Sequence, residues 1–445
     1  MSENLNPLAM LLNLLFERLK QEGIFFVLLR NYEELPEKVD NDIDVWVQEK
    51  DASKFYELLY ECSILAGWNR VSHIPRFGYK TDTFFYFEKP FNTLHIDCWH
   101  KIMWRNIKIA DDSVFRKHIQ KWHNKFLILT PGTEAAILLM VNVFYQRKMK
   151  EKYNSRILEC CKKDKTGFID ALKVPFGTKL AYEIFSAAIS GNWIWLKRKR
   201  RYMIFILTFR AILRQPLSQI RQWFIYAGSF FYQYLSPRMG LFVVLIGPDG
   251  SGKTTTANAI LKSDIKRFFI RSSYYHGHFK FLPELSKLFP FKKKWNHHEN
   301  VPSFNPPMHP LRATIYPVYY GINFFFGHLK VWQERARGGL IVFDRYFYDY
   351  LLQRQYSRCH RWAIHFIMKI IPKPDVIVYL KCAPEVINAR KPELSVEEIR
   401  QQQMVCDFLS QSLPNVSIVQ TTTFPEETLE TVQLIISNRL KSRHG

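Results

Sequence analysis

Residues Gly247–Thr254 have the types and the spacing that bind a polyphosphate. They read Gly-Pro-Asp-Gly-Ser-Gly-Lys-Thr, which matches G-x-x-x-x-G-K-[ST] without a mismatch. Glycines allow such a loop to curl until its backbone N–H groups point at the phosphates, and the helix that follows adds its positive N-terminal end. The pattern predicts that Lys253 bridges the β- and γ-phosphates of a nucleoside triphosphate and that Thr254 holds Mg²⁺.

A neighbouring acid and arginine form the second feature that could do chemistry. Asp344-Arg345-Tyr346 directly follows the apolar run Leu340–Phe343. An acid at the carboxyl end of a buried strand faces the ligand crevice of an open α/β sheet. We therefore expect Asp344 to orient Mg²⁺ or its waters, and Arg345 to bind the phosphate of an acceptor through two N–H groups. The alternative is an ordinary strand-end acid paired with its neighbour.

Buried strands that alternate with helices must position these residues. Short apolar runs predict strands at Leu241–Ile246, Leu340–Phe343, Val376–Leu380 and Ser417–Gln420. Helical spacing predicts helices at Ser251–Leu261, Val396–Leu413 and Pro425–Leu440. This alternation is typical of an α/β fold in which a parallel sheet is covered by helices on both faces.

Residues from about 240 to 440 resemble the thymidylate kinase family of P-loop kinases. The matching segments are Gly247–Thr255, Asp344-Arg345-Tyr346, Pro374–Leu380 followed by Pro384-Glu385, and Arg390-Lys391. The resemblance implies ATP-dependent phosphorylation with Mg²⁺. It also implies that Asp249 contacts the acceptor nucleoside and that Arg390 and Lys391 form a basic lid over the transferring phosphoryl group.

Two sets of site residues follow for this half of the chain. The expected catalytic residues are Lys253, Asp344, Arg345 and Arg390. The expected nucleotide-binding residues are Gly247, Asp249, Gly250, Ser251, Gly252, Lys253, Thr254, Thr255 and Lys391. The acceptor pocket is expected within residues 274–337, which are aromatic and rich in histidine. In this respect the chain is similar to thymidylate-kinase-like proteins encoded among bacterial polysaccharide and lipopolysaccharide genes.

Three acids nearer the N-terminus have the arrangement of a metal site. In Asp42-Ile43-Asp44 the two carboxylates lie on one face of a predicted strand, because side chains alternate along a strand. Asp97 lies in another strand pattern. Three carboxylates on neighbouring strands can hold one or two Mg²⁺ ions and activate a hydroxyl for attack on a triphosphate. The alternative is that Asp42 and Asp44 lie on a solvated edge and Asp97 pairs with His95 or a lysine.

Residues from about 20 to 130 resemble the nucleotidyltransferase superfamily. The resemblance rests on Leu28–Tyr32, Asp42-Ile43-Asp44 and Asp97 as the third acid. In that superfamily a Gly-Ser pair after the first strand grips the triphosphate, and here Arg30-Asn31 stands in its place. An inert relic that retains only the fold is the competing interpretation. Strands are expected at Ile24–Leu29, Asp42–Val47, Thr83–Phe87 and Thr93–Trp99, with a helix at Lys50–Ala66.

The middle of the chain has helical spacing and mixes cations with aromatic residues. Lys197–Arg201 is a block of five cations, and apolar stretches interrupted by arginines follow it. Three interpretations stay open: a helical connector packed on the kinase sheet, a basic amphipathic helix on an anionic membrane surface, or a nucleic-acid contact. The longest apolar runs fall short of the ~20 residues that span a bilayer. His297 and His298 are adjacent and point apart, so we do not expect a metal there.

Composition narrows the class of protein and of partner. The 445 residues include 63 Lys and Arg against 40 Asp and Glu, a formal net charge of +23, and 47% are hydrophobic. This excludes a disordered or fibrous chain and favours partners with negative charge. Seven scattered cysteines without a C-x-x-C pair argue against a disulfide framework or a zinc ribbon. With no visible signal peptide, a cytoplasmic protein is expected, with peripheral membrane contact and a homodimer left open.

These sequence features predict three domains and leave three functional hypotheses. The expected domains are a nucleotidyltransferase-like α+β domain at 1–129, a helical basic and aromatic connector at 130–238, and a P-loop kinase domain at 239–445. The first hypothesis is an ATP-dependent phosphotransferase acting on a nucleoside monophosphate or a glycan sugar, coupled to N-terminal nucleotidyl transfer. The second makes nucleotidyl transfer the main activity, with a regulatory nucleotide-binding domain. The third is a non-catalytic nucleotide sensor that binds membrane or nucleic acid.

Overall fold

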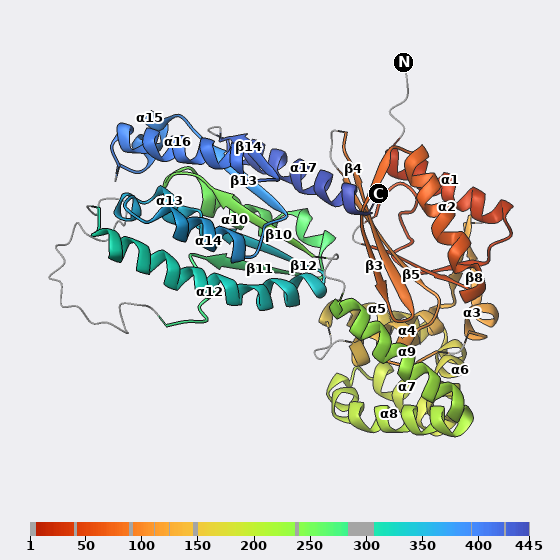
Figure 1. The fold of residues 1–445 in the computed structure, drawn as a ribbon. Coiled ribbons are helices and arrows are strands. Elements are labelled where there is room, and N and C mark those ends of the chain that lie inside the picture. Colours follow the sequence, from red (N-terminus) through yellow and green to blue (C-terminus); the bar gives the residue numbers. More distant parts are fainter. Residues whose placement is uncertain are drawn as a thin grey trace, which may run out of the picture. The chain divides into compact units, whose positions relative to one another are not determined.

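The computed structural model describes residues 6–39, 42–88, 92–110, 112–123, 125–145, 150–235, 240–283, 307–392, 394–421 and 424–444. The chain divides into two compact units, Met1–Tyr232 with His444–Gly445, and Gln233–Arg443 (Figure 1). Most of the segment 130–238, which the sequence suggests as a connector, therefore belongs to the first unit. His297 and His298 lie outside the described residues.

The first unit is built on a seven-stranded mixed sheet with the order β3-β4-β5-β2-β1-β9-β8 (Figure 1). The strands are β1 (Phe26–Arg30), β2 (Ile43–Val47), β3 (Trp68–Arg76), β4 (Tyr79–Tyr86), β5 (Asn92–Trp99), β8 (Ile119–Trp122) and β9 (Phe126–Leu129). β2 pairs antiparallel with β1 and parallel with β5, so that Asp44 is the register partner of Asp97. A small hairpin of β6 (Met103–Trp104) and β7 (Ile107–Lys108) follows β5.

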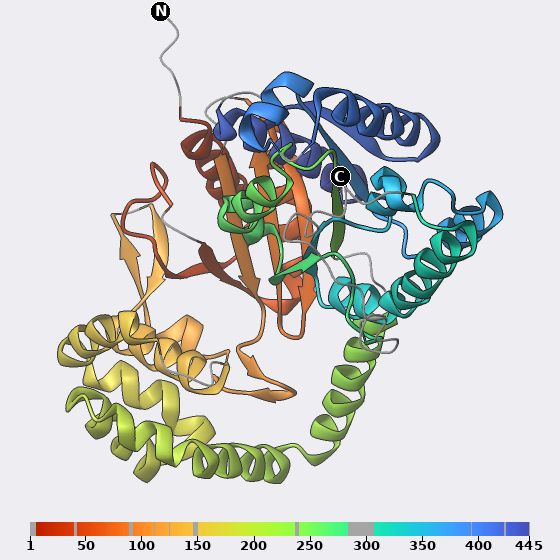
Figure 2. The same cartoon turned by 90° about the vertical axis from the view of Figure 1, so that its left-hand side faces the viewer.

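Helices cover both faces of this sheet. α1 (Pro7–Gln21) and α2 (Ala52–Leu65) pack with Leu28, Val45 and Ile96 in one hydrophobic core. Val27, Trp46 and other residues of the opposite face pack in a second core with the helices that follow the sheet. Those helices are α4 (Pro131–Tyr145), α5 (Asn154–Lys163), α6 (Lys165–Phe176), α7 (Thr178–Ile189) and α8 (Trp193–Arg214), with the short α3 (Val114–Lys117) before β8. α9 (Pro216–Leu235) completes the unit and lies apart from this bundle in Figure 2.

The second unit is a five-stranded parallel sheet with the order β11-β12-β10-β13-β14. Its strands are β10 (Leu241–Ile246), β11 (Arg271–His276), β12 (Gly339–Asp344), β13 (Val376–Lys381) and β14 (Val416–Gln420). Its helices are α10 (Lys253–Lys262), α12 (Pro310–Ala336), α13 (Asp349–Leu352), α14 (Arg361–Ile370), α15 (Pro384–Arg390), α16 (Val396–Ser412) and α17 (Pro425–His444). The central strand β10 is buried over its whole length, which explains its continuous apolar sequence.

Of the strands that the sequence did not predict, β3, β8 and β11 are edge strands and β6 and β7 form the separate hairpin, whereas β9 lies inside the sheet between β1 and β8. β11 reads Arg-Ser-Ser-Tyr-Tyr-His and is mostly exposed, and β3 contains Pro75 and several polar residues. Edge strands need neither an apolar run nor a complete set of backbone donors, so they give a weak sequence signal. Among the described residues, no helix has both the length and the apolar composition that would let it cross a lipid bilayer.

Candidate functional site

The glycine-rich loop joins the end of β10 to the start of α10. Gly247, Gly250 and Gly252 have φ values of 149°, 92° and 93°, which side-chain-bearing residues rarely adopt. A Cβ on Gly247 would lie 2.7 Å from the backbone oxygen of Leu380, whereas one on Gly252 would meet nothing within 4 Å. The loop is therefore curled tightly against the sheet at its first glycine and open at its last, beside the N-terminus of α10. Backbone N–H groups at such a helix start attract anions.

Two side chains at the start of α10 are held by this loop and by β12. The Lys253 ammonium is buried and donates to the backbone oxygens of Gly247 and Pro248, at 2.6 Å and 3.0 Å. The Thr254 hydroxyl donates to Asp344 Oδ2 at 2.5 Å. The loop hydroxyl and the strand-end acid, 90 positions apart in the sequence, thus meet in the fold.

Asp344 is the centre of a polar group at the carboxyl end of the sheet. It is fully buried, and Tyr274 from the end of β11 donates its hydroxyl to Oδ2 at 3.3 Å. His276 Nδ1 lies 3.4 Å from the same oxygen. The second carboxylate oxygen, Oδ1, is buried without a hydrogen-bond partner among the described residues. A buried carboxylate oxygen without a donor, next to a threonine hydroxyl, fits Mg²⁺, which prefers hard oxygen ligands.

Arg345 and Asp249 form an ion pair above the loop. Arg345 Nη2 lies 3.0 Å from Asp249 Oδ1, and the same oxygen lies 3.4 Å from the Lys253 ammonium. Burial would raise the pKa of Asp249, but Lys253, Arg345 and Lys391 outweigh it and leave this pKa below its usual value. Arg345 has a φ of 58°, a conformation that is uncommon outside glycine and that persists only where surrounding contacts hold it.

Arg390 and Lys391, which are expected to form a basic lid, lie at the end of α15. Arg390 is exposed and Lys391 is half-buried. A Cβ on Gly250 would lie 3.1 Å from the side chain of Ile387 and 3.4 Å from Cβ of Lys391, so α15 packs directly on the loop. Thr255, in the first turn of α10, is exposed. The loop, the strand-end acid and arginine, and Lys391 are therefore brought together.

A small cavity beside Asp249 and Arg345 is lined by residues that the sequence did not single out. Asp349, Gln353 and Gln402 line a cavity of about 20 Å³ with Asp249 and Arg345, which is room for about one water molecule. Asp349 is buried with its Oδ1 unpartnered among the described residues, and burial raises its pKa to about 7. The only sequence signal was its position, four residues after Arg345 in an aromatic stretch. The expected acceptor segment 274–337 is described only in part.

The three N-terminal acids meet on the face of the first sheet that the later helices cover. Asp42, Asp44 and Asp97 each place a carboxylate oxygen within 4.8 Å of the others. Asp44 is buried and accepts from the Trp99 indole N–H at 2.9 Å, and Asp97 accepts from the Thr81 hydroxyl at 2.6 Å. Asp42 and Asp44 share one face, as the strand period predicts, and the alternative that both lie on a solvated edge does not hold for the buried Asp44.

A guanidinium group lies on these acids. Arg30 Nε donates to Asp44, and its Nη2 lies 3.1 Å from Asp42 Oδ2. Tyr153, just before α5, accepts from Arg30 at 3.2 Å, and Asn31 donates to Asp42 at 3.1 Å. Arg30 and Asn31 thus bind acids of the same unit.

One cation does not balance three carboxylates. Burial raises the pKa of Asp44, against the opposing effect of Arg30. Burial and the neighbouring Asp44 raise the pKa of Asp97 to about 7. The cluster therefore holds excess negative charge that a proton or a metal ion can neutralise. Its carboxylate ligands suit Mg²⁺ or Mn²⁺.

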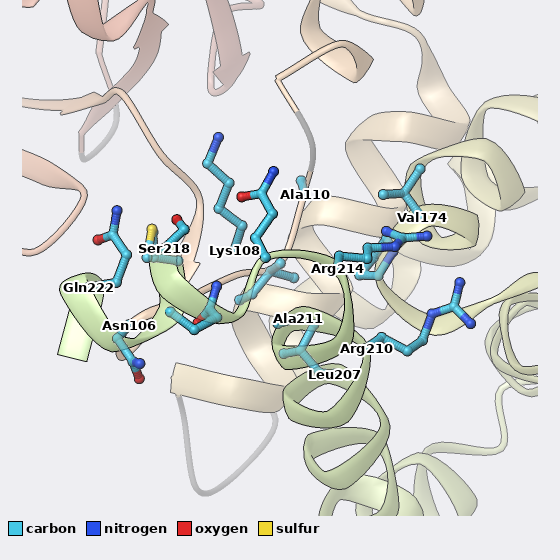
Figure 3. Close-up of a pocket in the computed structure, with 15 residues that line it drawn as sticks. Asn106, Lys108, Ala110, Val174, Leu207, Arg210, Ala211, Arg214, Ser218 and Gln222 are labelled. Carbon is cyan, nitrogen blue, oxygen red and sulfur yellow. The ribbon is translucent and has the colours of Figure 1, made fainter.

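A larger cavity of about 180 Å³ lies elsewhere in the first unit, where α8 and α9 meet the β6–β7 hairpin. It is lined by Lys108, Arg210, Arg214, several glutamines and apolar residues. Figure 3 shows the labelled polar ends spread around this space rather than converging on one point. None of the site residues expected from the sequence lines it.

Comparisons with known proteins add little to this geometry. No protein-family model matches the chain, and no curated protein matches it. Among solved structures, a thymidylate kinase from Ehrlichia chaffeensis matches with 14% sequence identity, over 44% of this chain and 98% of that chain. The TM-score is 0.30, which is too low to support an argument about fold or function.

Proposed function

We propose that the second unit is a Mg²⁺-dependent phosphotransferase that moves the γ-phosphoryl group of a nucleoside triphosphate to a small acceptor. The observation that carries the proposal is the 2.5 Å hydrogen bond between Thr254 and Asp344, which joins a complete phosphate-binding loop to the strand-end acid. The parallel sheet supports it, since ligands of open α/β sheets bind at the carboxyl ends of strands. ATP and Mg²⁺ are the proposed nucleotide and ion.

Each residue then has an electrostatic rather than a covalent task. The loop N–H groups and Lys253 bind the β- and γ-phosphates, after Lys253 exchanges its present contacts with the carbonyls of Gly247 and Pro248. Thr254 and Asp344 would hold Mg²⁺, which supplies charge neutralisation across the phosphates. Arg345, fixed by Asp249, binds acceptor phosphate. Arg390 and Lys391 neutralise the transferring group from above the loop.

The acceptor is proposed by chemical class. An arginine beside an acid favours an acceptor with both a phosphate and a hydroxyl, which fits a nucleoside monophosphate. A sugar of a surface glycan is the second choice, because the described part of residues 274–337 carries the histidines and tyrosines typical of hydroxyl recognition.

Turnover of ATP with each acceptor class tests this proposal. Lys253→Ala should lower the rate by about 10²- to 10³-fold, the usual cost of losing one group that stabilises transition-state charge. Lys262→Ala, at the exposed end of the same helix, makes the same change in charge and should leave the rate unchanged. Equal activity of wild type and Lys253→Ala would contradict the proposal, as would the absence of ATP·Mg²⁺ binding by calorimetry.

A second candidate function, metal-dependent nucleotidyl transfer by the first unit, is favoured by the meeting of Asp42, Asp44 and Asp97. In this hypothesis the acids hold the metal that activates an acceptor hydroxyl for attack on a nucleoside triphosphate, with release of pyrophosphate. Arg30 must then move from the acids to the triphosphate. The ion pairs of Arg30 with Asp42 and Asp44 equally support the inert relic.

Terbium luminescence distinguishes these two possibilities. Tb³⁺ binds oxygen ligands, and Trp99, which donates to Asp44, is placed to sensitise its emission. If the acids bind metal, Asp44→Asn and Asp97→Asn should each abolish most of the sensitised signal, whereas Asp170→Asn, at a half-buried position of α6 where the carboxylate pairs with His118, should not. If the wild type gives no terbium signal and releases no pyrophosphate from any nucleoside triphosphate, the inert relic is the correct interpretation of the first unit.

A further inference from the structure

The pair of helices α8 and α9 presents large apolar side chains to the outside of the first unit. Leu217 is 80% exposed and Phe224 is 74% exposed, and no residue of 216–232 is buried. The exposed apolar residues of the pair are Ile194, Tyr202, Phe205, Phe209, Ile212, Leu213, Leu217, Ile220, Trp223, Phe224, Ile225, Phe230, Phe231 and Tyr232. Large apolar side chains exposed in such number on two consecutive helices mark an interaction site.

These side chains form stripes at helical spacing. On α8, Ile194, Phe205, Phe209 and Ile212 share one face, and the rings of Phe205 and Phe209 stack with centroids 6.0 Å apart. The opposite face of α8 is buried in the core of the bundle through Leu196, Met203 and Leu207. α8 is therefore apolar on both sides, although only one side is covered by the chain's own residues.

The charges of the pair have a single sign. Residues 193–235 contain eight cations, and no acid lies between Glu183 and Asp249. Arg198 and Arg201 are exposed on the same face of α8 as Ile194 and Phe205. In contrast, Arg200 donates to the backbone oxygens of Val143 and Phe144 and so caps α4.

At the α8–α9 corner, polar side chains of both helices line a cavity together with apolar ones, while the largest apolar side chains of the pair are exposed. The cavity in Figure 3 is lined by Arg210, Arg214 and glutamines of α9, while Leu217 and Phe224 face outward. Among the described residues, neither Arg210 nor Arg214 has a hydrogen bond or ion pair. A solvent-exposed amphipathic helix puts its polar face outward. The outward apolar face therefore needs a partner that is both apolar and anionic.

We propose that α8 and α9 dock the protein on the surface of an anionic lipid bilayer. The apolar stripes enter the boundary between headgroups and acyl chains, and the cations of α8 contact the headgroup phosphates. The pair lies on the bilayer rather than across it, in keeping with the composition of both helices. A second copy of this chain is a poor occupant, because eight cations on each copy would repel. A nucleic acid would use the cations but leave the phenylalanines exposed.

Co-sedimentation of the full chain with vesicles tests the proposal. We expect binding to an equal mixture of phosphatidylcholine and phosphatidylglycerol, and much weaker binding to phosphatidylcholine alone. Arg198→Gln with Arg201→Gln should weaken binding by about thirtyfold. Leu217→Glu with Phe224→Glu should abolish it. Both pairs are exposed, so the fold is not expected to change.

Matched substitutions elsewhere in the first unit serve as controls. Lys173→Gln with Lys179→Gln removes two exposed cations, and Leu65→Glu places an acid on an exposed apolar position of α2. Neither should change vesicle binding. The proposal is overturned if the protein does not bind vesicles, or if the control variants weaken vesicle binding as much as the test variants do. It is equally overturned if polynucleotide competes fully with the vesicles and the protein with Leu217→Glu and Phe224→Glu still binds them. It is also overturned if the chain is a dimer that Phe224→Glu dissociates without any vesicle binding.

Discussion

The phosphate-binding loop of the second unit and the acid cluster of the first unit are ion-paired networks with opposite charge balance. At the loop, the cations Lys253, Arg345 and Lys391 surround Asp249, and the buried acids Asp344 and Asp349 lie beside them. At the cluster, one cation, Arg30, faces three acids. The surroundings of Asp249 are therefore dominated by cations that an anion can contact, whereas the cluster has negative charge left for a proton or a metal ion.

The two networks also differ in their effect on the pKa of a buried carboxyl group. The cations around Asp249 hold its pKa below the usual value despite burial. Burial and a neighbouring acid raise the pKa of Asp97 to about 7, and burial raises that of Asp349, beside the loop, to about 7. The balance of nearby charge, and not burial alone, decides whether a carboxyl group is ionised in each region. The following predictions test this difference.

The largest expected effect is at Arg345. Arg345→Ala removes a cation from the loop network, and kcat/KM for the acceptor should fall by about a hundredfold or more. Arg345→Lys should recover only part of this loss, since lysine lacks the paired N–H groups of arginine. Steady-state kinetics with varied acceptor check this. Arg354→Ala removes an exposed cation that follows α13 and pairs with Glu398, and this control should be neutral.

A smaller effect is expected on the pH dependence of stability in the first unit. The pKa of Asp97 is about 7 in the folded protein against 3.8 ordinarily, so the folded state binds this proton more tightly. Its stabilisation is complete below about pH 4 and is lost as the pH rises to about 7. Asp97→Asn should remove this dependence of the free energy of unfolding on pH. Urea unfolding followed by tryptophan fluorescence reports mainly on the first unit, which contains eight of the eleven tryptophans.

The same unfolding measurement with added Mg²⁺ distinguishes a metal site from an inert cluster of acids. A metal competes with protons for the carboxylates, so a metal site should become more stable with Mg²⁺ as the pH rises. An inert salt-bridged cluster should show the falling stability with or without Mg²⁺. If the free energy of unfolding of the wild type does not change between about pH 4 and pH 7, the raised pKa of Asp97 is itself contradicted.

The smallest effect is expected at Asp349. Its carboxyl group lines the cavity beside Arg345 and titrates near pH 7, so a role in orienting the acceptor hydroxyl requires the ionised form. The rate of phosphoryl transfer should then rise as the pH passes about 7. In Asp349→Asn this rise with pH should disappear, and the rate above pH 7 should be about tenfold lower than in the wild type. A variant that is less stable but keeps the wild-type pH profile would assign Asp349 a structural role only.

Much of the second unit was predictable because its signals are local. β10 matches the predicted Leu241–Ile246, and α16 ends one residue before the predicted Leu413. A buried central strand is continuously apolar, so its limits can be read directly. The exposed edge strand β11 was missed, and with it the contacts of Tyr274 and His276 with Asp344. In the first unit the strand period placed Asp42 and Asp44 on one face, but it carried no information on where Arg30 would lie.

The amino-acid sequence by itself determined the curl of the loop, the positions of Lys253 and Thr254, and the single charge sign of α8 and α9. These depend on backbone freedom and side-chain types within a few residues. Only the tertiary structure decided that Arg30 lies on the acids of β2, that Asp349 and Gln402 border the same cavity, and which stripe of α8 is left uncovered. Such contacts join residues far apart in the chain, and strand order and helix packing set them through the free energy of the whole core.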